Sequence, residues 1–324
     1  MVKPLVLVLF GPTASGKTAL LQDLSQCGGF PPLEIISADS MQVYRGMDIG
    51  TAKPSLEERQ RIPHHLIDIK DPNEQFNAGE FVGLAETACH EIINRGSLPV
   101  VSGGTGFFIQ NLVQGLSAAP PSDPVIRETL FAELSQKGAG PLMEELARAD
   151  PVSADRIHPN DHYRLIRALE VFRQSGRPLS SFPSPWNNVQ APAERPFRFL
   201  LIGLERERED LYERINHRCA EMFRRGLPEE AARLLARGYE PGLGGLRAIG
   251  YNEFFVKDDQ DQWAISRDSE GVQALVAQNS RRYAKRQVTY FKALKGVHWV
   301  KMGEGREVEA LEQVRELIGG ELEC

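Results

Sequence analysis

The stretch that most constrains the fold is a glycine-rich octapeptide near the start of the chain. Its residues are Gly11, Pro12, Thr13, Ala14, Ser15, Gly16, Lys17 and Thr18. An apolar, β-branched run precedes it at 5–10 and a helical pattern follows it, which predicts strand, loop and helix in that order. This is the GxxxxGK[ST] spacing of a phosphate-binding loop (P-loop), in which backbone N–H groups and the helix N-terminus face phosphate oxygens. Lys17 would add a positive charge and the Thr18 hydroxyl could ligate a magnesium ion. The loop therefore predicts a site for a magnesium-bound di- or triphosphate.

Strands and helices alternate through the first part of the chain, which predicts an α/β fold with a doubly wound parallel sheet of the P-loop NTPase type. After the P-loop strand, further strands are expected at 34–38, 65–69 and 98–102, with a helix at 77–95 that begins with a capping pattern. The pattern then becomes purely helical, with helices expected at 125–137, 141–149 and 161–175. Strands at 197–204 and 297–301 return later, with helices expected at 209–225, 228–236, 271–294 and 307–318. We expect a core formed by 1–119 and 196–324, interrupted by a helical insertion at 120–195.

The overall composition limits the class of protein. The 324 residues are 41% hydrophobic and 25% charged, as in an ordinary globular protein, and the formal net charge is −6. This charge argues against a protein coated with basic residues, but it leaves room for a local basic face. The apolar run at 5–10 leads directly into the P-loop and is too short to span a bilayer, so we expect neither a leader nor a membrane segment. The four cysteines, Cys27, Cys89, Cys219 and Cys324, have no paired spacing, which favours a reducing cytoplasm and no zinc site.

Two polar segments follow expected strands and are candidates for chemistry. Asp39, with Ser40, Met41 and Gln42 after it, ends the strand at 34–38, and ligands of parallel sheets lie at the carboxyl ends of strands. Gly103, Gly104 and Thr105 form a second turn of this kind. An ordinary turn or cap aspartate and a plain strand-to-helix turn remain alternatives. Arg164 and Arg167 share one face of an expected helix, where a solvated basic stripe is the alternative.

A further candidate is a basic helix near the C-terminus. No Asp or Glu occurs between Gly271 and Gly303, in a chain that is acidic overall. The cationic residues of this stretch are Arg281, Arg282, Lys285, Arg286, Lys292 and Lys295, and Tyr283, Tyr290 and Phe291 interleave them. Such segregation is what binding to a nucleic-acid backbone requires, and it favours that interpretation over an ordinary solvated face.

Together the motifs resemble those of one family, the bacterial tRNA dimethylallyltransferases. The resemblance runs from the P-loop almost to the C-terminus. The matching segments are GPTASGKT (11–18), SADSMQVYRGMDIGTAKP (37–54), SGGTG (102–106), RIHPNDHYRLIRALE (156–170), LRAIGY (246–251) and YAKRQ (283–287). The P-loop alone is shared by many families, whereas the 37–54 segment is highly specific.

The resemblance implies a reaction. A dimethylallyl group would move from its diphosphate, held by the P-loop with Mg²⁺, to the exocyclic N6 amine of the adenosine immediately 3′ of a tRNA anticodon. Asp39 would be the general base, and Thr105 and Arg218 would lie at the reacting centre. The implied partners are dimethylallyl diphosphate and the anticodon stem-loop of tRNA, for a cytoplasmic protein that we expect to be a monomer.

The resemblance also implies which residues contact tRNA. Besides Asp39, Ser40, Met41, Gln42 and Thr105, they are Arg127, Tyr163, Arg164, Leu165, Ile166, Arg167, Arg247, Ala248, Ile249, Gly250, Tyr251 and Asn252. The basic helix adds Arg282, Lys285 and Arg286. Two positions depart from the family pattern: Asn252 stands where some members have Arg, and Tyr290 where many have Trp.

Three other functions share parts of this pattern. A small-molecule kinase would bind ATP at the same P-loop but would not need the basic helix. A non-catalytic RNA-binding P-loop protein would not need Asp39. An adenylate-prenylating relative would take a free nucleotide, which leaves the helical insertion and the basic helix without a role.

Overall fold

The structure, a computed structural model, describes residues 3–183 and 195–323. Cys324 and most of the Pro-, Ser- and Asn-rich stretch at 178–196 therefore lie outside the described residues. The chain divides into two compact units, a large one formed by residues up to 113 and from 195 onward, and a smaller one at 114–194. The boundaries of 120 and 195 that were expected for the helical insertion stay a prediction.

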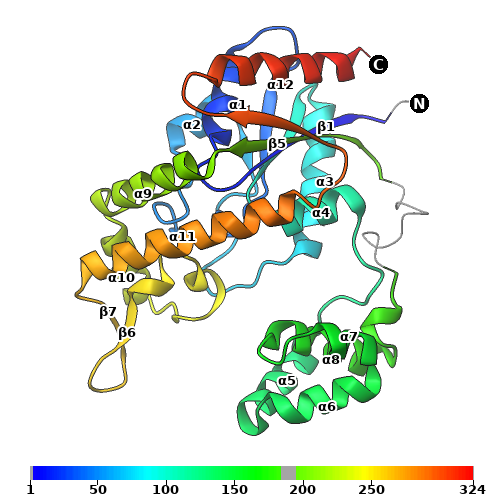
Figure 1. Ribbon diagram of the computed structural model, residues 1–324, viewed down its shortest axis with the longest axis vertical. Coiled ribbons are helices and arrows are strands. Elements are labelled where there is room, and N and C mark those ends of the chain that lie inside the picture. The colour runs from blue at the N-terminus through cyan, green and yellow to red at the C-terminus, as the bar shows by residue number, and fades with distance from the viewer. Residues whose placement is uncertain (1–2, 184–194, 324) are drawn as a thin grey trace. The chain divides into compact units, whose positions relative to one another are not determined.

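The large unit is built on a six-stranded parallel sheet of order β3-β2-β4-β1-β5-β8 (Figure 1). Its strands are β1 (Leu5–Phe10), β2 (Leu33–Ser37), β3 (His64–His65), β4 (Leu98–Gly103), β5 (Arg198–Arg206) and β8 (Val297–Met302). β1 is central and pairs with β4 on one side and β5 on the other, with Leu7 opposite Val100 and Leu200. The predicted α/β fold with a parallel sheet is confirmed.

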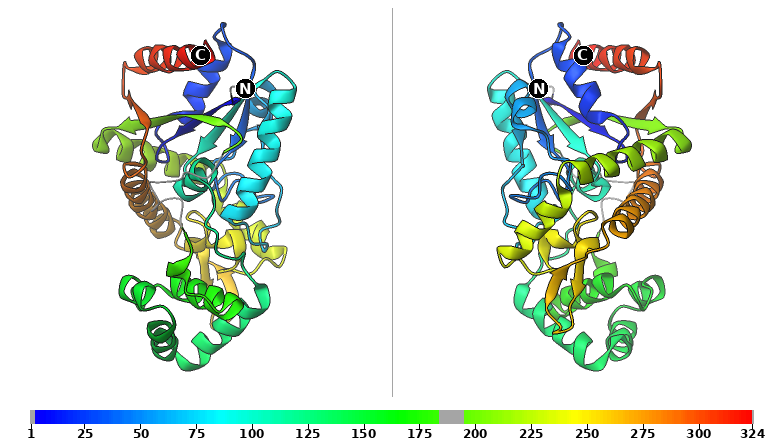
Figure 2. Two further views of the ribbon diagram at one scale, coloured as in Figure 1. Left: turned by 90° about the vertical axis from the view of Figure 1, so that its right-hand side faces the viewer. Right: turned by 90° about the vertical axis from the view of Figure 1, so that its left-hand side faces the viewer.

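Alternating side chains of β1 bury themselves on opposite faces of the sheet. Leu5, Leu7 and Leu9 belong to a cluster on the face covered by α1 (Lys17–Gln26) and α12 (Glu307–Leu322). Val6, Val8 and Phe10 belong to the cluster under α3 (Ala78–Asn94) and α4 (Gly106–Gln114). Figure 2 shows α12 and α3 on the two sides of the sheet. Because α1 and α4 leave the adjacent strands β1 and β4 toward opposite faces, the strand ends between them form the crevice where ligands of such sheets bind.

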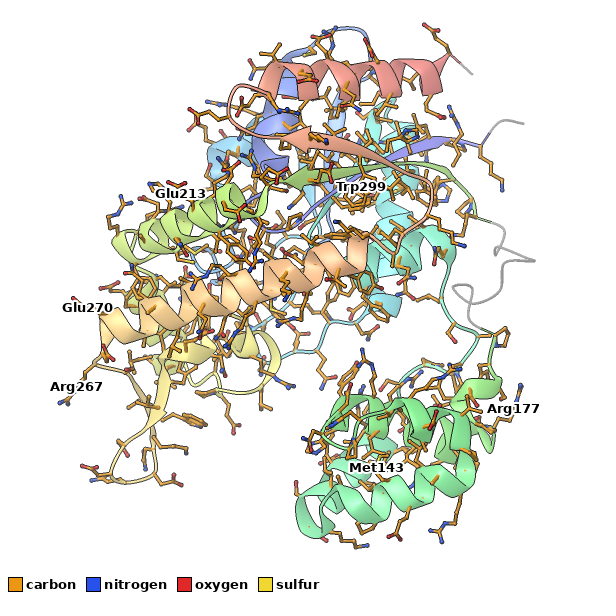
Figure 3. The ribbon with its side chains drawn as sticks, viewed as in Figure 1. Met143, Arg177, Glu213, Arg267, Glu270 and Trp299 are labelled. Atoms are coloured by element: carbon orange, nitrogen blue, oxygen red, sulfur yellow. The ribbon has the colours of Figure 1, made fainter. Side chains whose placement is uncertain are left out.

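A third core lies beyond the carboxyl ends of the strands. It is formed mainly by α9 (Arg208–Arg224), α10 (Leu227–Ala236) and α11 (Ser269–Phe291), together with residues 43–47. Figure 1 shows α9 and α11 running side by side, and their residues contact each other. Four short elements here were not predicted: η2 (Gly244–Arg247), η3 (Asn252–Phe254), and the antiparallel strands β6 (Phe255–Lys257) and β7 (Trp263–Ile265). On the sheet itself, Trp299 of β8 (labelled in Figure 3) packs edge-on against Phe10 of β1, with 6.0 Å between the centres of the two rings.

The strand expected at 65–69 is wrong in its extent. β3 contains only His64 and His65, because Leu66 and Asp68 adopt left-handed backbone angles, with φ of 62° and 57°. The chain turns there so that the Asp68 carboxylate reaches the buried ammonium of Lys53 at 2.6 Å. The helix α2 (Leu56–Arg61), which was also not predicted, begins nearby with a complete capping box on Ser55.

The smaller unit is helical. Its helices are α5 (Pro124–Lys137), α6 (Ala139–Ala149), α7 (Pro151–Arg156), α8 (His162–Ser175) and η1 (Leu179–Ser181), and its described residues contain no strand. A core of leucines and other apolar residues joins α5, α6 and α8, with Met143 of α6 at its edge (Figure 3). Asp150 is fully buried and accepts hydrogen bonds from Ser153 and Ser180, which ties η1 to the start of α7. Of these elements, α7 and η1 were not predicted. None of the described helices in either unit is long and apolar enough to cross a membrane.

Candidate active site

A cavity of about 1060 Å³ opens in the large unit where the strands of the sheet end. The P-loop and Asp39–Gln42 contribute to its wall, and so do Ser102–Gly104 at the end of β4, the side of α9 near Arg218, and α11. The backbones come close here: a Cβ added to Gly103 would lie 2.1 Å from the Ala38 carbonyl oxygen, so only glycine fits. The structure thus brings together segments that are up to about 270 residues apart in sequence.

The P-loop forms one wall of the cavity. Its turn requires left-handed backbone angles, with φ of 107° at Gly16 and 65° at Ala14. The Lys17 ammonium donates to the carbonyl oxygens of Gly11 and Pro12, both at 2.9 Å. Two arginines hold the outside of the loop: Arg214 donates to the Ala14 carbonyl at 3.0 Å and Arg206 to that of Ser15 at 3.4 Å. Neither arginine was predicted as a site residue from the sequence.

The cavity has an excess of buried positive charge. Burial, and then the nearby Arg218 guanidinium, lower the pKa of Lys17 to about 7, while Asp39 opposes this. Burial also lowers the pKa of Arg218, again opposed by Asp39. Two cations therefore share one carboxylate in a poorly solvated site, an arrangement that an anionic ligand such as a diphosphate would relieve.

Asp39 and Thr105 come from adjacent strand ends. One carboxylate oxygen of Asp39 accepts a hydrogen bond from the backbone N–H of Met41 at 2.9 Å. The Thr105 hydroxyl accepts from the backbone N–H of Ser40 at 3.0 Å, and the Thr105 N–H donates to the Ala38 carbonyl at 3.1 Å. Asp39 lines the cavity, and these contacts hold Thr105 against the two residues that flank Asp39.

Two side chains of α11 that were not predicted as site residues also line the cavity. Gln287 is 5% exposed, accepts from the backbone N–H of Thr13 at 2.9 Å and donates to the Gly104 carbonyl at 2.7 Å. The Tyr283 hydroxyl lies next to the side chains of Thr105 and Gln287, and burial raises the Tyr283 pKa to about 12. The signal in the sequence was their spacing of four residues, which puts both on one helix face between the basic residues.

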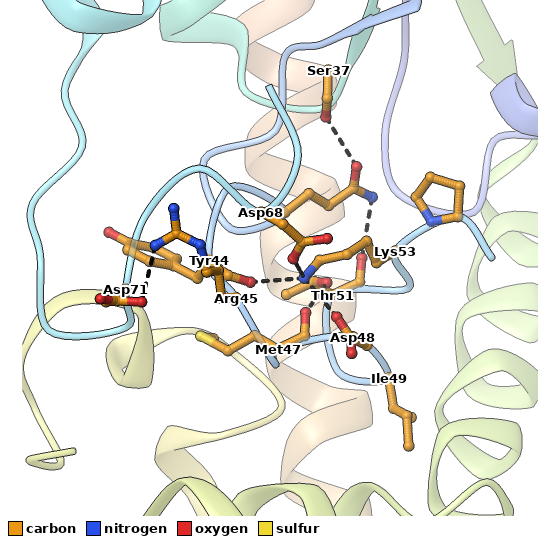
Figure 4. Close-up of polar contacts among 12 residues, drawn as sticks. Ser37, Tyr44, Arg45, Met47, Asp48, Ile49, Thr51, Lys53, Asp68 and Asp71 are labelled. Carbon is orange, nitrogen blue, oxygen red and sulfur yellow. Dashed lines mark hydrogen bonds and ion pairs between the residues drawn. The ribbon is translucent and has the colours of Figure 1, made fainter. Parts of the chain in front are cut away.

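The segment after Asp39 is held by a network of polar contacts around the buried Lys53 (Figure 4). The Gln42 side chain accepts from the Ser37 hydroxyl at 2.9 Å and donates to carbonyls of the 51–52 turn at 3.4 Å. Lys53 fixes that turn, because its ammonium contacts the Tyr44 carbonyl and the carboxylates of Asp48 and Asp68. Gln42 therefore has a defined orientation at the cavity wall.

The second segment expected to contact tRNA, 247–252, lies beside this network. Arg247, Ala248 and Ile249 line the cavity, and Asn252 is exposed. Tyr251 has no exposed surface, because its hydroxyl donates to the buried Glu230 carboxylate at 2.6 Å. The Tyr251 side chain therefore presents no surface to a ligand in this structure, and the tRNA contact expected of the segment 247–252 stays a prediction.

The basic residues of α11 occupy its outer face. Arg282, Lys285 and Arg286 are exposed, and Arg286 also borders the cavity, with its guanidinium 5.7 Å from the centre of the Tyr283 ring. A basic surface thus adjoins the cavity on the same helix that supplies Tyr283 and Gln287.

The remaining residues expected to contact tRNA lie in the smaller unit. Arg127 places its guanidinium 5.0 Å from the ring of the exposed Tyr163, and Arg164 is exposed beside Asp161. The Arg167 guanidinium forms an ion pair with the carboxylate of the fully buried Glu170, with 2.8 Å between Nη1 and Oε2. Leu165 and Ile166 have no exposed surface and pack in the core, and the tRNA contact expected of the segment 163–167 stays a prediction.

The donor set of the cavity suits a lightly held magnesium ion better than a fully protein-bound metal. No group of three or more His, Cys, Asp or Glu residues that could hold a metal occurs among residues 3–183 and 195–323. The Thr18 hydroxyl lines the cavity at the first turn of α1. Mg²⁺ keeps several waters and takes its other ligands from phosphate oxygens, so one hydroxyl at a P-loop fits it.

Comparisons with known protein families agree with this arrangement. Residues 42–294 match the model of the family described as IPP transferase, and residues 4–74 match that described as isopentenyl transferase. The chain is 44% identical over 299 residues to the tRNA dimethylallyltransferase of Geobacter sulfurreducens, covering 92% of both chains. It is 43% identical over 309 residues to that of Desulfosudis oleivorans, covering 94% of this chain and 93% of the relative.

Solved structures show the same likeness. The full-length tRNA isopentenylpyrophosphate transferase of Bacillus halodurans matches with a TM-score of 0.68 and 36% identity, over 99% of this chain and 97% of that one. A eukaryotic dimethylallyltransferase described as acting on tRNA matches with a TM-score of 0.78 and 27% identity, over 96% of this chain and 77% of that one.

Proposed function

Because the chain belongs to the IPP transferase family, we propose that it transfers a dimethylallyl group from dimethylallyl diphosphate to tRNA, at the N6 amine of the adenosine immediately 3′ of the anticodon. The observation that carries the proposal is the convergence in one cavity of the P-loop, the partly buried cations Lys17 and Arg218, and the Asp39 carboxylate.

The diphosphate is the leaving group, and its developing charge is stabilised by the P-loop wall. Backbone N–H groups of the P-loop and the N-terminus of α1 supply fixed dipoles, while Lys17 and Arg218 supply full charges. Because both cations are partly buried, water screens their interaction with the diphosphate less than it would at the surface. Thr18 would hold a Mg²⁺ ion, which when bound neutralises part of the diphosphate charge.

The acceptor amine enters from the side of Asp39. An exocyclic amine on an aromatic ring is a weak nucleophile, and Asp39 accepts its proton as the C–N bond to the allylic carbon forms and the C–O bond to the diphosphate breaks. The target base must leave its stack to reach the cavity, and exclusion of water there protects the allylic diphosphate from hydrolysis. Thr105, hydrogen-bonded to Ser40, borders the place where the amine would lie.

The proposed partners are dimethylallyl diphosphate and the anticodon stem-loop of tRNA, and the protein is proposed to act as a cytoplasmic monomer. The exposed basic face of α11 and the Arg127–Tyr163 pair offer contacts of the type used with phosphates and single-stranded bases. A kinase that binds ATP at the P-loop is a weaker candidate, because it leaves the basic face of α11 without a role.

The test is a transfer assay with labelled dimethylallyl diphosphate and unmodified tRNA, followed by mass analysis of the nucleosides. A dimethylallyl mass on the adenosine 3′ of the anticodon supports the proposal. Phosphoryl transfer from ATP to a small molecule, with no labelled tRNA, would support the kinase instead.

A further inference from the structure

Helix α11 presents two different faces near the cavity. Arg282 and Lys285 are exposed and do not line the cavity, whereas Tyr283 and Gln287, one helical turn apart, do. Arg286 lies between the two faces, because it is exposed and also borders the cavity. The cavity side of the helix carries no charge at these two positions, since the Tyr283 pKa is raised to about 12 by burial.

Gln287 joins two loops that follow adjacent strands. Its amide accepts from the backbone N–H of Thr13, after β1, and donates to the carbonyl of Gly104, after β4. A neutral amide of this length supplies the acceptor and the donor at once. The fit is close, because a Cβ added to Gly104 would lie 2.4 Å from the Gln287 amide nitrogen.

Tyr283 stands beside this connection on the same helix. Its hydroxyl lies next to the side chains of Gln287 and Thr105, and the Thr105 hydroxyl accepts a hydrogen bond from the backbone N–H of Ser40. Hydrogen bonds therefore link the P-loop at Thr13 through Gln287 to Gly104, and the neighbouring Thr105 to Ser40, the residue next to Asp39.

We propose that Tyr283 and Gln287 are positioning residues that set the distance between the diphosphate held by the P-loop and the amine held near Asp39 and Thr105. The identity of the reaction rests on the proposed function. Displacement of reacting groups by about 1 Å can cost about 100-fold in rate, so two loops that shift independently would slow transfer even with both substrates bound.

The test uses three variants and one control in the full chain. Gln287→Met removes the amide but keeps the length of the side chain, and Tyr283→Phe removes only the hydroxyl. Gln287→Glu keeps an acceptor for Thr13 but places a negative charge beside the diphosphate. The control, Glu34→Gln, weakens the contacts of Glu34 with Arg95 and His65 at the amino end of β2, where it does not line the cavity.

Four quantities are measured: the single-turnover transfer rate with both substrates saturating, the Kd of inorganic diphosphate, the Kd of tRNA, and hydrogen exchange of the peptide 11–18. We expect Gln287→Met to lower the rate about 10- to 100-fold while each Kd changes less than about threefold, and to speed exchange in the P-loop. Tyr283→Phe should lower the rate about 3- to 10-fold, within the same limit. Gln287→Glu should instead raise the Kd of diphosphate by about tenfold or more.

A wild-type transfer rate in Gln287→Met, or unchanged exchange at 11–18, would overturn the proposal. The proposal would also be overturned if Glu34→Gln lost as much transfer rate as Gln287→Met while the two variants had similar melting temperatures. Lower stability alone would then explain the loss of rate. If Gln287→Met does not fold, a wild-type rate in Tyr283→Phe overturns the proposal. The exchange and diphosphate measurements need no transfer to tRNA, so failure of the proposed function, seen as no transfer by the wild type, is distinguishable from failure of this inference.

Discussion

Binding of a diphosphate to this protein should take up a proton at Lys17. In the free protein, burial and Arg218 lower the Lys17 pKa to about 7. The lysine is therefore about 90% neutral at pH 8 and about 90% charged at pH 6. A diphosphate beside the ammonium favours the charged form and returns the pKa toward its ordinary value of 10.5. We expect an uptake of about 0.9 proton per diphosphate at pH 8 and about 0.1 at pH 6.

The sign of the effect on affinity follows from the same linkage. Because the Lys17 pKa is lowered, the free protein loses the positive charge of this ammonium as pH rises through about 7. The complex with diphosphate keeps this charge, because its Lys17 pKa is higher. The Kd of the diphosphate should therefore rise by about tenfold per pH unit above pH 7.5, until the pKa of the complex is reached.

The assay is titration calorimetry of inorganic diphosphate with Mg²⁺ at pH 8, in two buffers of different ionisation enthalpy. The matched control is Lys17→Arg, which keeps a charged side chain at every pH and so reports only the proton exchange of the ligand. An uptake in the wild type equal to that in Lys17→Arg would refute the reasoning. Arg218→Met should raise the Lys17 pKa and shrink the uptake at pH 8, because the second cation is gone.

Four further results are expected. Asp39→Asn keeps the size of the side chain but cannot accept the proton, so single-turnover transfer should fall about 10²- to 10⁴-fold with tRNA affinity nearly unchanged, and a near-normal rate would leave Asp39 with a positioning role only. Thr18→Ala should raise the Mg²⁺ concentration that half-saturates transfer, measured by titration against the wild type, and an identical titration would place the ion elsewhere. Replacing Arg282, Lys285 and Arg286 by Gln should make the plot of the logarithm of the tRNA association constant against log salt concentration less steep, because up to about three fewer counterions are released on binding. An unchanged slope would show that this face does not contact RNA. Hydrogen bonds from Arg95, and then from His65, lower the Glu34 pKa from 4.5 to about 2, so this carboxylate contributes stability above pH 4.5 that is lost as pH falls through about 2. The free energy of unfolding in urea should therefore depend less on pH across this range in Glu34→Gln than in the wild type, and parallel curves for the two proteins would contradict this.

The sequence by itself determined the features that depend on local spacing. The GxxxxGK[ST] pattern between an apolar strand and a helix specifies the P-loop, because glycine at position 16 allows the left-handed angle that the turn needs. The position of Asp39 and Thr105 after expected strands was enough to predict that they share one edge of the sheet, since parallel strands end together. The helical periods of the insertion and the charge of α11 were likewise readable from periodicity and composition.

Only the tertiary structure decided which distant groups meet. Gln287 contacts Thr13, 274 residues away, and Gly104, 183 residues away, and no local pattern specifies such partners. The strand expected at 65–69 ended at His65 because a buried lysine requires a carboxylate partner, which draws Asp68 into a left-handed turn. Tyr251, Leu165 and Ile166 proved to be core residues for a related reason: a motif marks a segment, but burial decides which of its side chains can touch a ligand. The lowered pKa of Lys17 likewise arises from desolvation and from Arg218 across the cavity, both of which exist only once the chain has folded.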